Sequence, residues 1–446
     1  MGDQTVDLLG RLVRLGCVND LTADSGGEER AADLLEEFFA GLPVSIERIT
    51  PHPGRTSLVV TVEGADPRSA GTPLTLLGHT DVVPVDTAKW TRDPFGAQIE
   101  DDVMWGRGTV DMLHLTAAMA VVTREVARRA QDGNPLARSL VFVAAADEEA
   151  RGGLGVPWIG DNKPNALPWD AALSEMGGAH VRGRRGGDSV VVVVGEKGAA
   201  QRRLHIRGDA GHGSVPLGRM SAVERLAQVS AALSAARWPT ATDEVWAGFV
   251  RAFEFDETIE TSLINGTYEG DYSEFEDLAA FAHAISHVTV AQTVAHSGGP
   301  INVLPSHATL ELDIRTLPGV NDDDVDAAIA AALGDLAEHV TIERLLSEAA
   351  TASSIDTDLY RVIEAALTQR YPGTRVVPVL FPGGSDLRVA RRLGGIGYGF
   401  GAVDSGASLG QVYSQLHAHD EHIALADVRA TAEVLHEVVT SYLTDV

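Results

Sequence analysis

Residues 76–84 read Leu76-Leu77-Gly78-His79-Thr80-Asp81-Val82-Val83-Pro84. The apolar run from Leu74 to Gly78 predicts a buried strand that ends at the edge of its sheet. His79 and Asp81 follow it two residues apart, so in extended backbone both side chains point to the same side. A carboxylate commonly orients a zinc-bound imidazole. The stretch therefore predicts a metal site at a strand end, and an ordinary turn is the alternative.

The composition limits the classes of function. The 446 residues include 35 Lys plus Arg and 63 Asp plus Glu, which gives a formal net charge of −28. Such an acidic surface repels phosphate backbones and anionic lipid, so we expect no nucleic-acid and no membrane partner. We find no apolar run of membrane-spanning length and no secretory signal in residues 1–7, and we expect a cytoplasmic enzyme. Because Cys17 is the single cysteine, any metal must be held by His, Asp and Glu.

Acidic residues recur where predicted strands end. The run 139–146 is apolar on both faces, as in a central parallel strand, and is followed by Asp147-Glu148-Glu149. The run 171–174 is followed by Glu175, and Asp111 precedes an alanine-rich helical pattern. Adjacent carboxylates repel one another unless cations neutralise them, and ligands bind at the carboxyl edge of open α/β sheets. For Asp111 alone, a helix N-cap is the alternative interpretation.

The pattern of predicted elements changes twice along the chain. An α/β pattern with a mostly parallel sheet extends to about residue 198, and alternating strands and helices with a polar middle follow it. A strand over 309–315 closes this α+β segment, and the α/β pattern resumes beyond Pro318. We therefore expect a catalytic domain in two parts, 1–198 and 317–446, around an inserted domain at 199–316.

Six short motifs occur together in an order that resembles the M20 family of metallopeptidases, and the resemblance covers almost the whole chain. That family holds carboxypeptidases, dipeptidases, aminoacylases and the amidohydrolases of ornithine and diaminopimelate biosynthesis. The motifs are Gly78-His79-Thr80-Asp81-Val82-Val83-Pro84, Trp105-Gly106-Arg107-Gly108 through Asp111-Met112, Asp147-Glu148-Glu149, Gly211-His212-Gly213-Ser214, Asn302-Val303-Leu304-Pro305 and Gly383-Gly384-Ser385-Asp386.

The resemblance implies a zinc-exopeptidase-like catalytic domain that holds two divalent metal ions. Zinc is the first choice, with cobalt and manganese as alternatives. Asp111 would bridge the two ions, as carboxylates do in two-metal sites. His79 and Glu175 would complete the coordination of one ion, and Glu149 and His417 that of the other.

Two more carboxylates receive roles from the same resemblance. Asp81 would orient His79, and Glu148 would take a proton from metal-bound water and pass it to the leaving amine. His419 is the rival to His417 for the last ligand position. His417 is preferred because it has the family's His-x-x-Asp-Glu spacing.

The inserted segment resembles the family's lid domain, which commonly pairs two subunits, so we expect a homodimer through this domain. His212 matches the lid histidine that reaches a substrate carbonyl in the neighbouring subunit, and a histidine in a tight glycine turn is the alternative. Asn302 and Arg315 resemble lid positions associated with substrate binding. Arg315 suits a substrate carboxylate, although an ion pair with Asp313 is the simpler explanation.

Gly383, Gly384 and Ser385 precede a predicted helix, where backbone N–H groups can bind a substrate carboxylate. The predicted reaction is hydrolysis of an amide or peptide bond next to a free carboxylate, by a carboxypeptidase or dipeptidase. The alternative is an aminoacylase or deacylase acting on N-acyl amino acids. A non-catalytic binding homologue is a third reading, against which the complete ligand set argues. The substrate would be a small peptide or an N-acyl amino acid.

Overall fold

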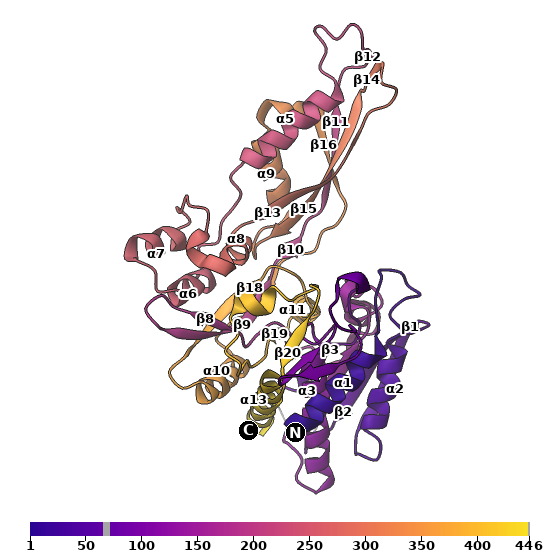
Figure 1. The fold of residues 1–446 in the computed structure, drawn as a ribbon, viewed down its shortest axis with the longest axis vertical. Helices are drawn as coiled ribbons and strands as arrows, with labels where there is room; N and C mark the ends of the chain where they lie inside the picture. Colours follow the sequence, from indigo (N-terminus) through magenta and orange to yellow (C-terminus); the bar gives the residue numbers. More distant parts are fainter. Residues whose placement is uncertain (66–71, 445–446) are drawn as a thin grey trace.

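The central sheet joins strands from both ends of the chain (Figure 1). The computed structural model describes residues 1–65 and 72–444. Over these residues the sheet has ten strands in the order β1-β2-β6-β3-β7-β19-β9-β17, and β8 and β18 also pair with β9. The strands are β1 (Ser45–His52), β2 (Arg55–Val62), β3 (Leu74–His79), β6 (Leu140–Ala145), β7 (Ala171–Ser174), β8 (His180–Arg182), β9 (Asp188–Glu196), β17 (Thr351–Ala352), β18 (Arg375–Phe381) and β19 (Ile396–Gly399). Because β6, β3, β7 and β19 run parallel, the predicted α/β class with a mostly parallel sheet is confirmed.

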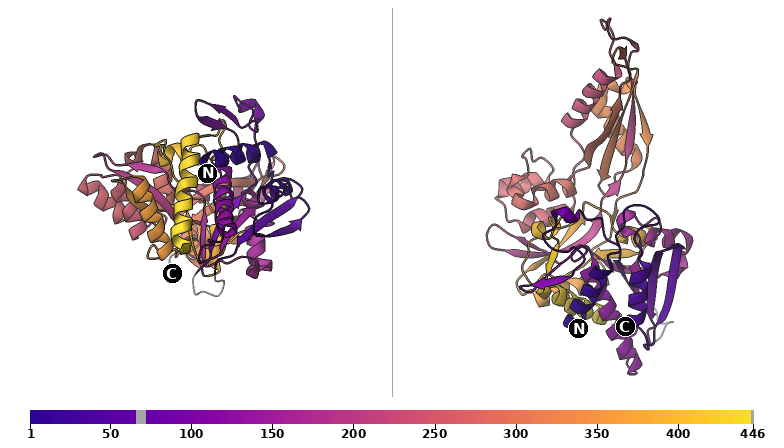
Figure 2. Two further views of the ribbon diagram at one scale, coloured as in Figure 1. Left: turned by 90° about the horizontal axis from the view of Figure 1, so that it is seen from below. Right: turned by 45° about the vertical axis from the view of Figure 1, so that its right-hand side comes forward.

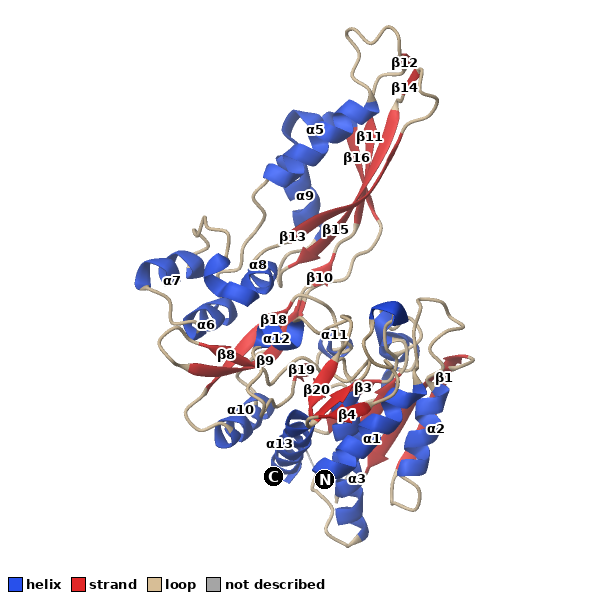
Figure 3. Ribbon diagram, viewed as in Figure 1, coloured by secondary structure: helices blue, strands red, loops and turns tan. Residues whose placement is uncertain are grey.

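Helices cover both faces of this sheet (Figures 2 and 3). Successive residues of β3 point to opposite faces, so Leu76 belongs to the apolar cluster that includes α1, α3 and α13, while Leu77 belongs to the cluster that includes α4 and α11. Within the described residues, no helix is both long and apolar enough to span a bilayer. The helices are α1 (Gly2–Leu15), α2 (Glu29–Phe38), α3 (Leu113–Gln131), α4 (Val156–Asn162), α5 (Ala222–Ala235), α6 (Glu244–Ala252), α7 (Glu257–Ile264), α8 (Ala279–Ser286), α9 (Asp322–Leu333), α10 (Asp358–Arg370), α11 (Leu387–Arg392), α12 (Leu409–Tyr413) and α13 (Leu425–Thr444).

A second sheet, the outer sheet, projects away from the central sheet (Figures 1 and 2). Its order is β10-β15-β11-β16, and β13 also pairs with β15. Helices α5 and α9 pack together, and α5 also lies against β11 and β15. The strands are β10 (Gly198–Ala199), β11 (Arg202–Arg207), β13 (Thr289–Ser297), β15 (His307–Thr316) and β16 (Val340–Arg344).

Strand pairing moves the expected boundary of the inserted segment. β16 lies next to β11, with Leu204 opposite Ile342, so the outer sheet extends well beyond residue 316. The sequence prediction assigned these residues to the second part of the catalytic domain, and that boundary is wrong. Conversely, α6 packs against β18 of the central sheet, although it lies inside the predicted insert. Amphipathic patterns show that one face of an element is buried but not against which sheet it packs.

Two small sheets place motifs far from each other in the sequence side by side. β20 (His422–Ala424) pairs with β5 (Val103–Trp105), which pairs with β4 (Gln98–Glu100). This pairing brings the segment after His417 to the loop that carries Asp111. β12 (Gly211–His212) pairs with β14 (Val303–Leu304) at the far tip of the projection (Figure 1).

Candidate metal centre

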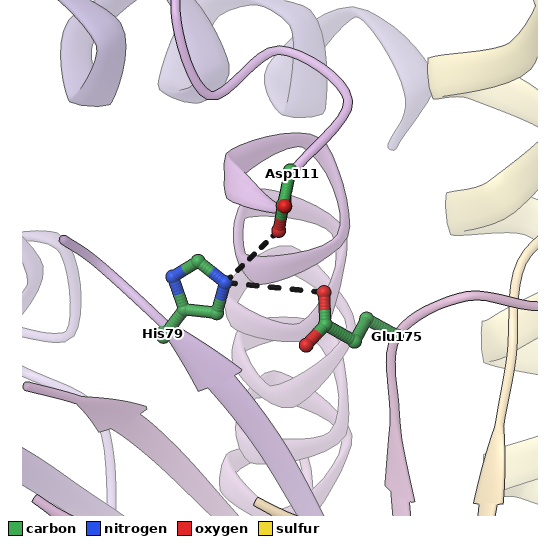
Figure 4. Close-up of side chains that lie close together, drawn as sticks. All are labelled: His79, Asp111 and Glu175. Atoms are coloured by element: carbon green, nitrogen blue, oxygen red, sulfur yellow. Dashed lines mark hydrogen bonds and ion pairs between the residues drawn. The ribbon is translucent and has the colours of Figure 1, made fainter. Parts of the chain in front are cut away.

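The first group of metal donors lies at the carboxyl edge of the central sheet (Figure 4). His79 ends β3 and Glu175 follows β7, and these strands are parallel neighbours, so their carboxyl ends coincide. Asp111 comes from the loop before α3. His79 Nε2 lies 3.2 Å from Asp111 Oδ1 and 3.9 Å from Glu175 Oε2. All three residues are buried.

The second group shares Asp111 with the first. His417 Nε2 lies 3.3 Å from Asp111 Oδ2 and 3.2 Å from Glu149 Oε2. The two oxygens of Asp111 therefore face different histidines, as expected of a carboxylate between two ions. His417 joins this group and His419 does not, in agreement with the preferred assignment.

The chemistry of the donors fits two divalent cations. His79 Nδ1 is hydrogen-bonded to a main-chain carbonyl, which directs Nε2 toward the carboxylates. Glu149 Oε1 and Glu175 Oε2 are buried and have no hydrogen-bond partner among the described residues. Imidazole and carboxylate are ligands that zinc accepts, and two cations would neutralise this buried negative charge.

Without cations, the electrostatics of the cluster are unfavourable. Burial, and then the charge of Asp111, raise the pKa of Glu149 to about 7 and that of Glu175 well above its usual value. Hydrogen bonds to Asp111 and Glu149 raise the pKa of His417 to about 10. Burial opposes protonation of His79, but Asp111 and Glu175 outweigh it and raise the pKa of that imidazole. A metal ion that binds either imidazole would displace a proton from it, because a histidine ligand must be neutral.

Asp81 contacts His79 as predicted, but the hydrogen bond comes from its main chain. The main-chain carbonyl of Asp81 bonds to His79 Nδ1 at 2.9 Å, while the carboxylate lies 3.6 Å away, beyond hydrogen-bond distance. The carboxylate instead accepts the N–H groups of Glu148 (3.2 Å) and Glu149 (3.1 Å), together with Asn19 Nδ2 (2.9 Å). The hydrogen bond to His79 thus comes from the main chain of Asp81, while the carboxylate lies within ion-pair distance of the imidazole and fixes the turn of the two glutamates.

Glu148 faces a cleft of about 430 Å³ beside both donor groups. Burial raises the pKa of Glu148 well above its usual value, and the charges of Asp386 and Glu149 add to this effect. Three arginines and one lysine line the same cleft, namely Arg151, Arg315, Arg388 and Lys197, and burial lowers the pKa of Lys197 to about 7. A carboxylate with a raised pKa next to the donor groups can both accept and return a proton.

Three of the predicted substrate-binding residues, Arg315, Gly383 and Gly384, line the cleft, whereas Ser385 does not. Arg315 lines the cleft but forms a two-point ion pair with Asp313, at 2.9 and 3.2 Å, as the simpler explanation proposed. Gly383 and Gly384 also line the cleft. Ser385 does not offer its N–H to a substrate, because both its N–H and its hydroxyl donate to the buried carboxylate of Glu196.

His212 and Asn302 lie away from the metal centre of their own chain. His212 ends β12 and Asn302 directly precedes β14, in the small sheet at the tip of the projection, while β3 lies in the central sheet (Figure 1). Gly213 N–H donates to the Asn302 carbonyl at 2.7 Å, and His212 Nδ1 is 2.7 Å from Ser214 Oγ. The structure thus brings these two predicted residues together, but not to the donor groups.

Two residues at the site, Glu421 and Arg388, had no role predicted from the sequence. Glu421 is fully buried and accepts bonds from the N–H groups of Gly108 (3.0 Å) and Val110 (2.7 Å) and from Arg107 Nη1 (2.7 Å). Its place in the His-x-x-Asp-Glu motif, four residues after His417, could have indicated a role at the metal centre. Arg388, which lines the cleft, was also not predicted. Its position in the first turn of α11, shortly after the glycine loop, could have indicated a site for an anionic substrate group.

The α/β fold and the two donor groups that share a carboxylate are those of the metallopeptidase class. The chain belongs to the family described as Peptidase family M20/M25/M40, whose family model matches residues 75–441. The resemblance inferred from the motifs is therefore confirmed.

Relatives with different printed activities match this chain. It is 27% identical over 344 residues to "Probable carboxypeptidase S-like 2" of Dictyostelium discoideum, covering 74% of this chain but only 64% of that relative. It is 26% identical over 451 residues to a succinyl-diaminopimelate desuccinylase of Cereibacter sphaeroides, covering 98% of each. Among solved structures, an M20 family metallo-carboxypeptidase of Sulfolobus solfataricus matches with a TM-score of 0.70 and 21% identity over 99% of each chain.

Proposed function

We propose that this chain hydrolyses an amide bond next to a free carboxylate, with two divalent metal ions of which zinc is the first choice. The observation that carries the proposal is the position of Asp111, whose two oxygens face separate donor groups beside Glu148. The names of the relatives, a carboxypeptidase and a desuccinylase, support cleavage of this kind of bond.

The metal ions and the side chains of the cleft would have different roles in the reaction. When bound, the metal ions would lower the pKa of water and polarise the scissile carbonyl. Glu148 would accept the proton from the attacking water and return it to the leaving amine. Arg388, next to the glycine loop, would hold the substrate carboxylate, because a guanidinium bonds both of its oxygens at once.

A peptidase is our first choice, and a deacylase of N-acyl amino acids is the second. The second is favoured by the desuccinylase, which matches this chain over 98% of its length. The test is to load the purified protein with zinc and assay it against dipeptides and N-acyl amino acids, with metal content measured in parallel. We expect two ions per chain and turnover of at least one of the two groups. Saturation at one ion, with no turnover of either group, would overturn the proposal.

We further propose a homodimer in which the tip of each projection reaches the partner's cleft. Apolar side chains gather beside His212 and Asn302 at the tip and are strongly exposed, namely Val215 (60%), Leu217 (98%), Ile301 (103%) and Val303 (46%). Grouped exposed apolar side chains are typical of a binding surface. β13 is paired on one side, with β15, within the described residues, so its other edge is open to a second copy. His212 would then bond the substrate carbonyl in the partner. Light scattering should give twice the chain mass.

A further inference from the structure

A second, largely apolar cavity adjoins the cleft. Its volume is about 230 Å³, and it lies between the ends of β7 and β19, α12 and β20. It shares part of its lining with the cleft, where the boundary is formed by Glu175, Met176, Phe381, Tyr413 and Leu416. Nothing in the mechanism proposed above uses this space.

The cavity offers a ligand little besides apolar surface. Several of its polar residues are already hydrogen-bonded: Ser405 donates its N–H and hydroxyl to Asp427, at 2.6 and 2.8 Å, and Thr431 Oγ1 bonds the main chain of Ala402. Two buried polar atoms of the lining have no hydrogen-bond partner among the described residues, namely His114 Nδ1 and Oε2 of Glu175, which is one of the candidate metal donors. Burial lowers the pKa of His114 to about 4, so this lining residue is neutral at pH 7. Protein interiors rarely leave unfilled apolar space of this size, and a buried water needs several polar partners. An apolar occupant therefore suits the cavity better than water.

The residues shared by the cleft and the cavity would let an apolar group pass from one to the other. The Tyr413 ring stands between two phenylalanines, with ring centroids 5.3 Å from Phe281 and 6.4 Å from Phe381. Met176 follows the donor Glu175 directly and has a left-handed backbone, with φ of 77°. Such a conformation is uncommon for a residue with a side chain and recurs at binding sites. The methionine side chain is flexible enough to adapt to different ligands.

The distribution of charged residues indicates which half of the substrate enters the cavity. Arginine and lysine side chains line the cleft, whereas the described residues that line the cavity include neither. A substrate carboxylate is held on the cationic side, so the group beyond Glu175 is the one attached to the scissile carbonyl. An engineered cavity of about 150 Å³ binds benzene, so a space of 230 Å³ holds a group of at least that size.

Resting on the function proposed above, we propose that this cavity receives an apolar acyl group of the substrate. The substrate class is an N-acyl amino acid, or a dipeptide, whose acyl half carries a phenyl ring or a chain of about six carbons. Acetyl substrates would leave the cavity unfilled. Because one methylene group in an apolar pocket changes kcat/KM by roughly 10–200-fold, phenylacetyl substrates should exceed acetyl substrates at least tenfold.

The test compares kcat/KM for acetyl, hexanoyl and phenylacetyl derivatives of one amino acid. Ala407→Phe fills the cavity from its lining and should bring the phenylacetyl-to-acetyl ratio close to one. Ala40→Phe, an equal change at an exposed alanine after α2, is the matched control and should leave the ratio as in the unmodified protein. If Ala407→Phe does not fold, Val412→Phe, another lining position, replaces it. A ratio near one in the unmodified protein, or a ratio that neither filling variant changes, overturns the inference.

A binding measurement separates this inference from the proposed function. Toluene should raise the melting temperature of the unmodified protein and of Ala40→Phe, but not that of the filled variant. If no amide is hydrolysed, the proposed function fails, and a selective toluene effect still supports an apolar site. If toluene has no such effect either, the cavity proposal fails with it.

Discussion

Glu421 Oε1 accepts a hydrogen bond from the main-chain N–H of Asp111, at 3.1 Å, across 310 residues of sequence. The same carboxylate binds Arg107 and two more N–H groups of the loop that leads to Asp111. The carboxylate shared by the two donor groups is therefore fixed by a residue four positions after His417. The family's His-x-x-Asp-Glu motif thus supplies both a candidate metal donor and the support for another.

Replacing Glu421 with alanine should destabilise the metal-free protein by about 3–5 kcal/mol, because it leaves Arg107 buried and unpaired. Urea unfolding of chelator-treated protein measures this loss. Glu433→Ala removes an exposed carboxylate that also pairs with an arginine, Arg370, and should cost less than about 1 kcal/mol. Equal losses in the two variants would contradict the supporting role of Glu421.

Asp81→Asn should weaken the second donor group more than the first. The amide replaces one acceptor oxygen by a donor, which then faces the N–H of Glu148 or Glu149. His79 keeps its bond to the main-chain carbonyl. Zinc titrations in two backgrounds measure each group alone: Glu175→Ala leaves the second, and His417→Ala leaves the first. A larger loss of affinity in the His417→Ala background would show that the carboxylate acts on His79 instead.

Glu148→Gln should retain both metal ions, because Glu148 is a member of neither donor group. Loss of the proton acceptor should lower kcat by roughly 10²–10⁴-fold at nearly unchanged KM. Metal analysis alongside steady-state kinetics distinguishes the roles of the two glutamates, and Glu149→Gln is the matched comparison. If Glu148→Gln loses metal and Glu149→Gln does not, the two roles are reversed.

Mixing two inactive variants tests whether His212 serves the partner subunit. His212→Ala and Glu148→Ala should each be inactive, and a heterodimer of the two contains one cleft with both residues intact. Activity should therefore return after subunit exchange, and if His212 resembles other donors to a developing oxyanion, its own loss costs about 2.7–4 kcal/mol. Exchange is followed by mass spectrometry. Confirmed exchange without activity would place His212 outside the partner's reaction.

Cys17 should resist alkylation in the folded protein. Burial raises the pKa of its thiol to about 12, and the side chain is 3% exposed, so at pH 8 hardly any thiolate is available to react. Because the pKa is raised, reactivity should increase only as the pH approaches 12 or as the protein unfolds. Mass spectrometry after iodoacetamide treatment, with and without urea, measures this. Rapid labelling of the folded chain at pH 8 would contradict the burial of this thiol.

The sequence predicted the donor groups better than their supports. His79, Glu149 and Glu175 follow apolar strands, and parallel neighbouring strands bring their ends together, so their position at one sheet edge was predictable, while their roles as donors came from the resemblance to the family. For Asp81, the sequence did not show that the main-chain carbonyl, and not the carboxylate, makes the hydrogen bond with His79, because a residue offers both groups. The Ser385 N–H was assigned to substrate because Glu196, which takes it, comes from a strand 189 residues earlier.

The extent of the outer sheet was also beyond the sequence pattern. β16 alternates like any half-buried strand, and only its register against β11 shows which sheet it completes. Likewise, the helical pattern of α6 shows one buried face but not that β18 covers it. Local periodicity thus gives the type of each element, while its partner depends on contacts between distant segments.

The order in which the donors appear along the chain has a consequence for biosynthesis. A growing polypeptide that has emerged from the ribosome past Glu175 already contains every member of the first donor group. His417, needed by the second group, and Glu421, which clamps Asp111, are translated much later. If the two groups hold the two ions proposed above, a fragment that ends between residues 175 and 417 would retain the donors of one ion only, and its Asp111 would lack the hydrogen bond to Glu421.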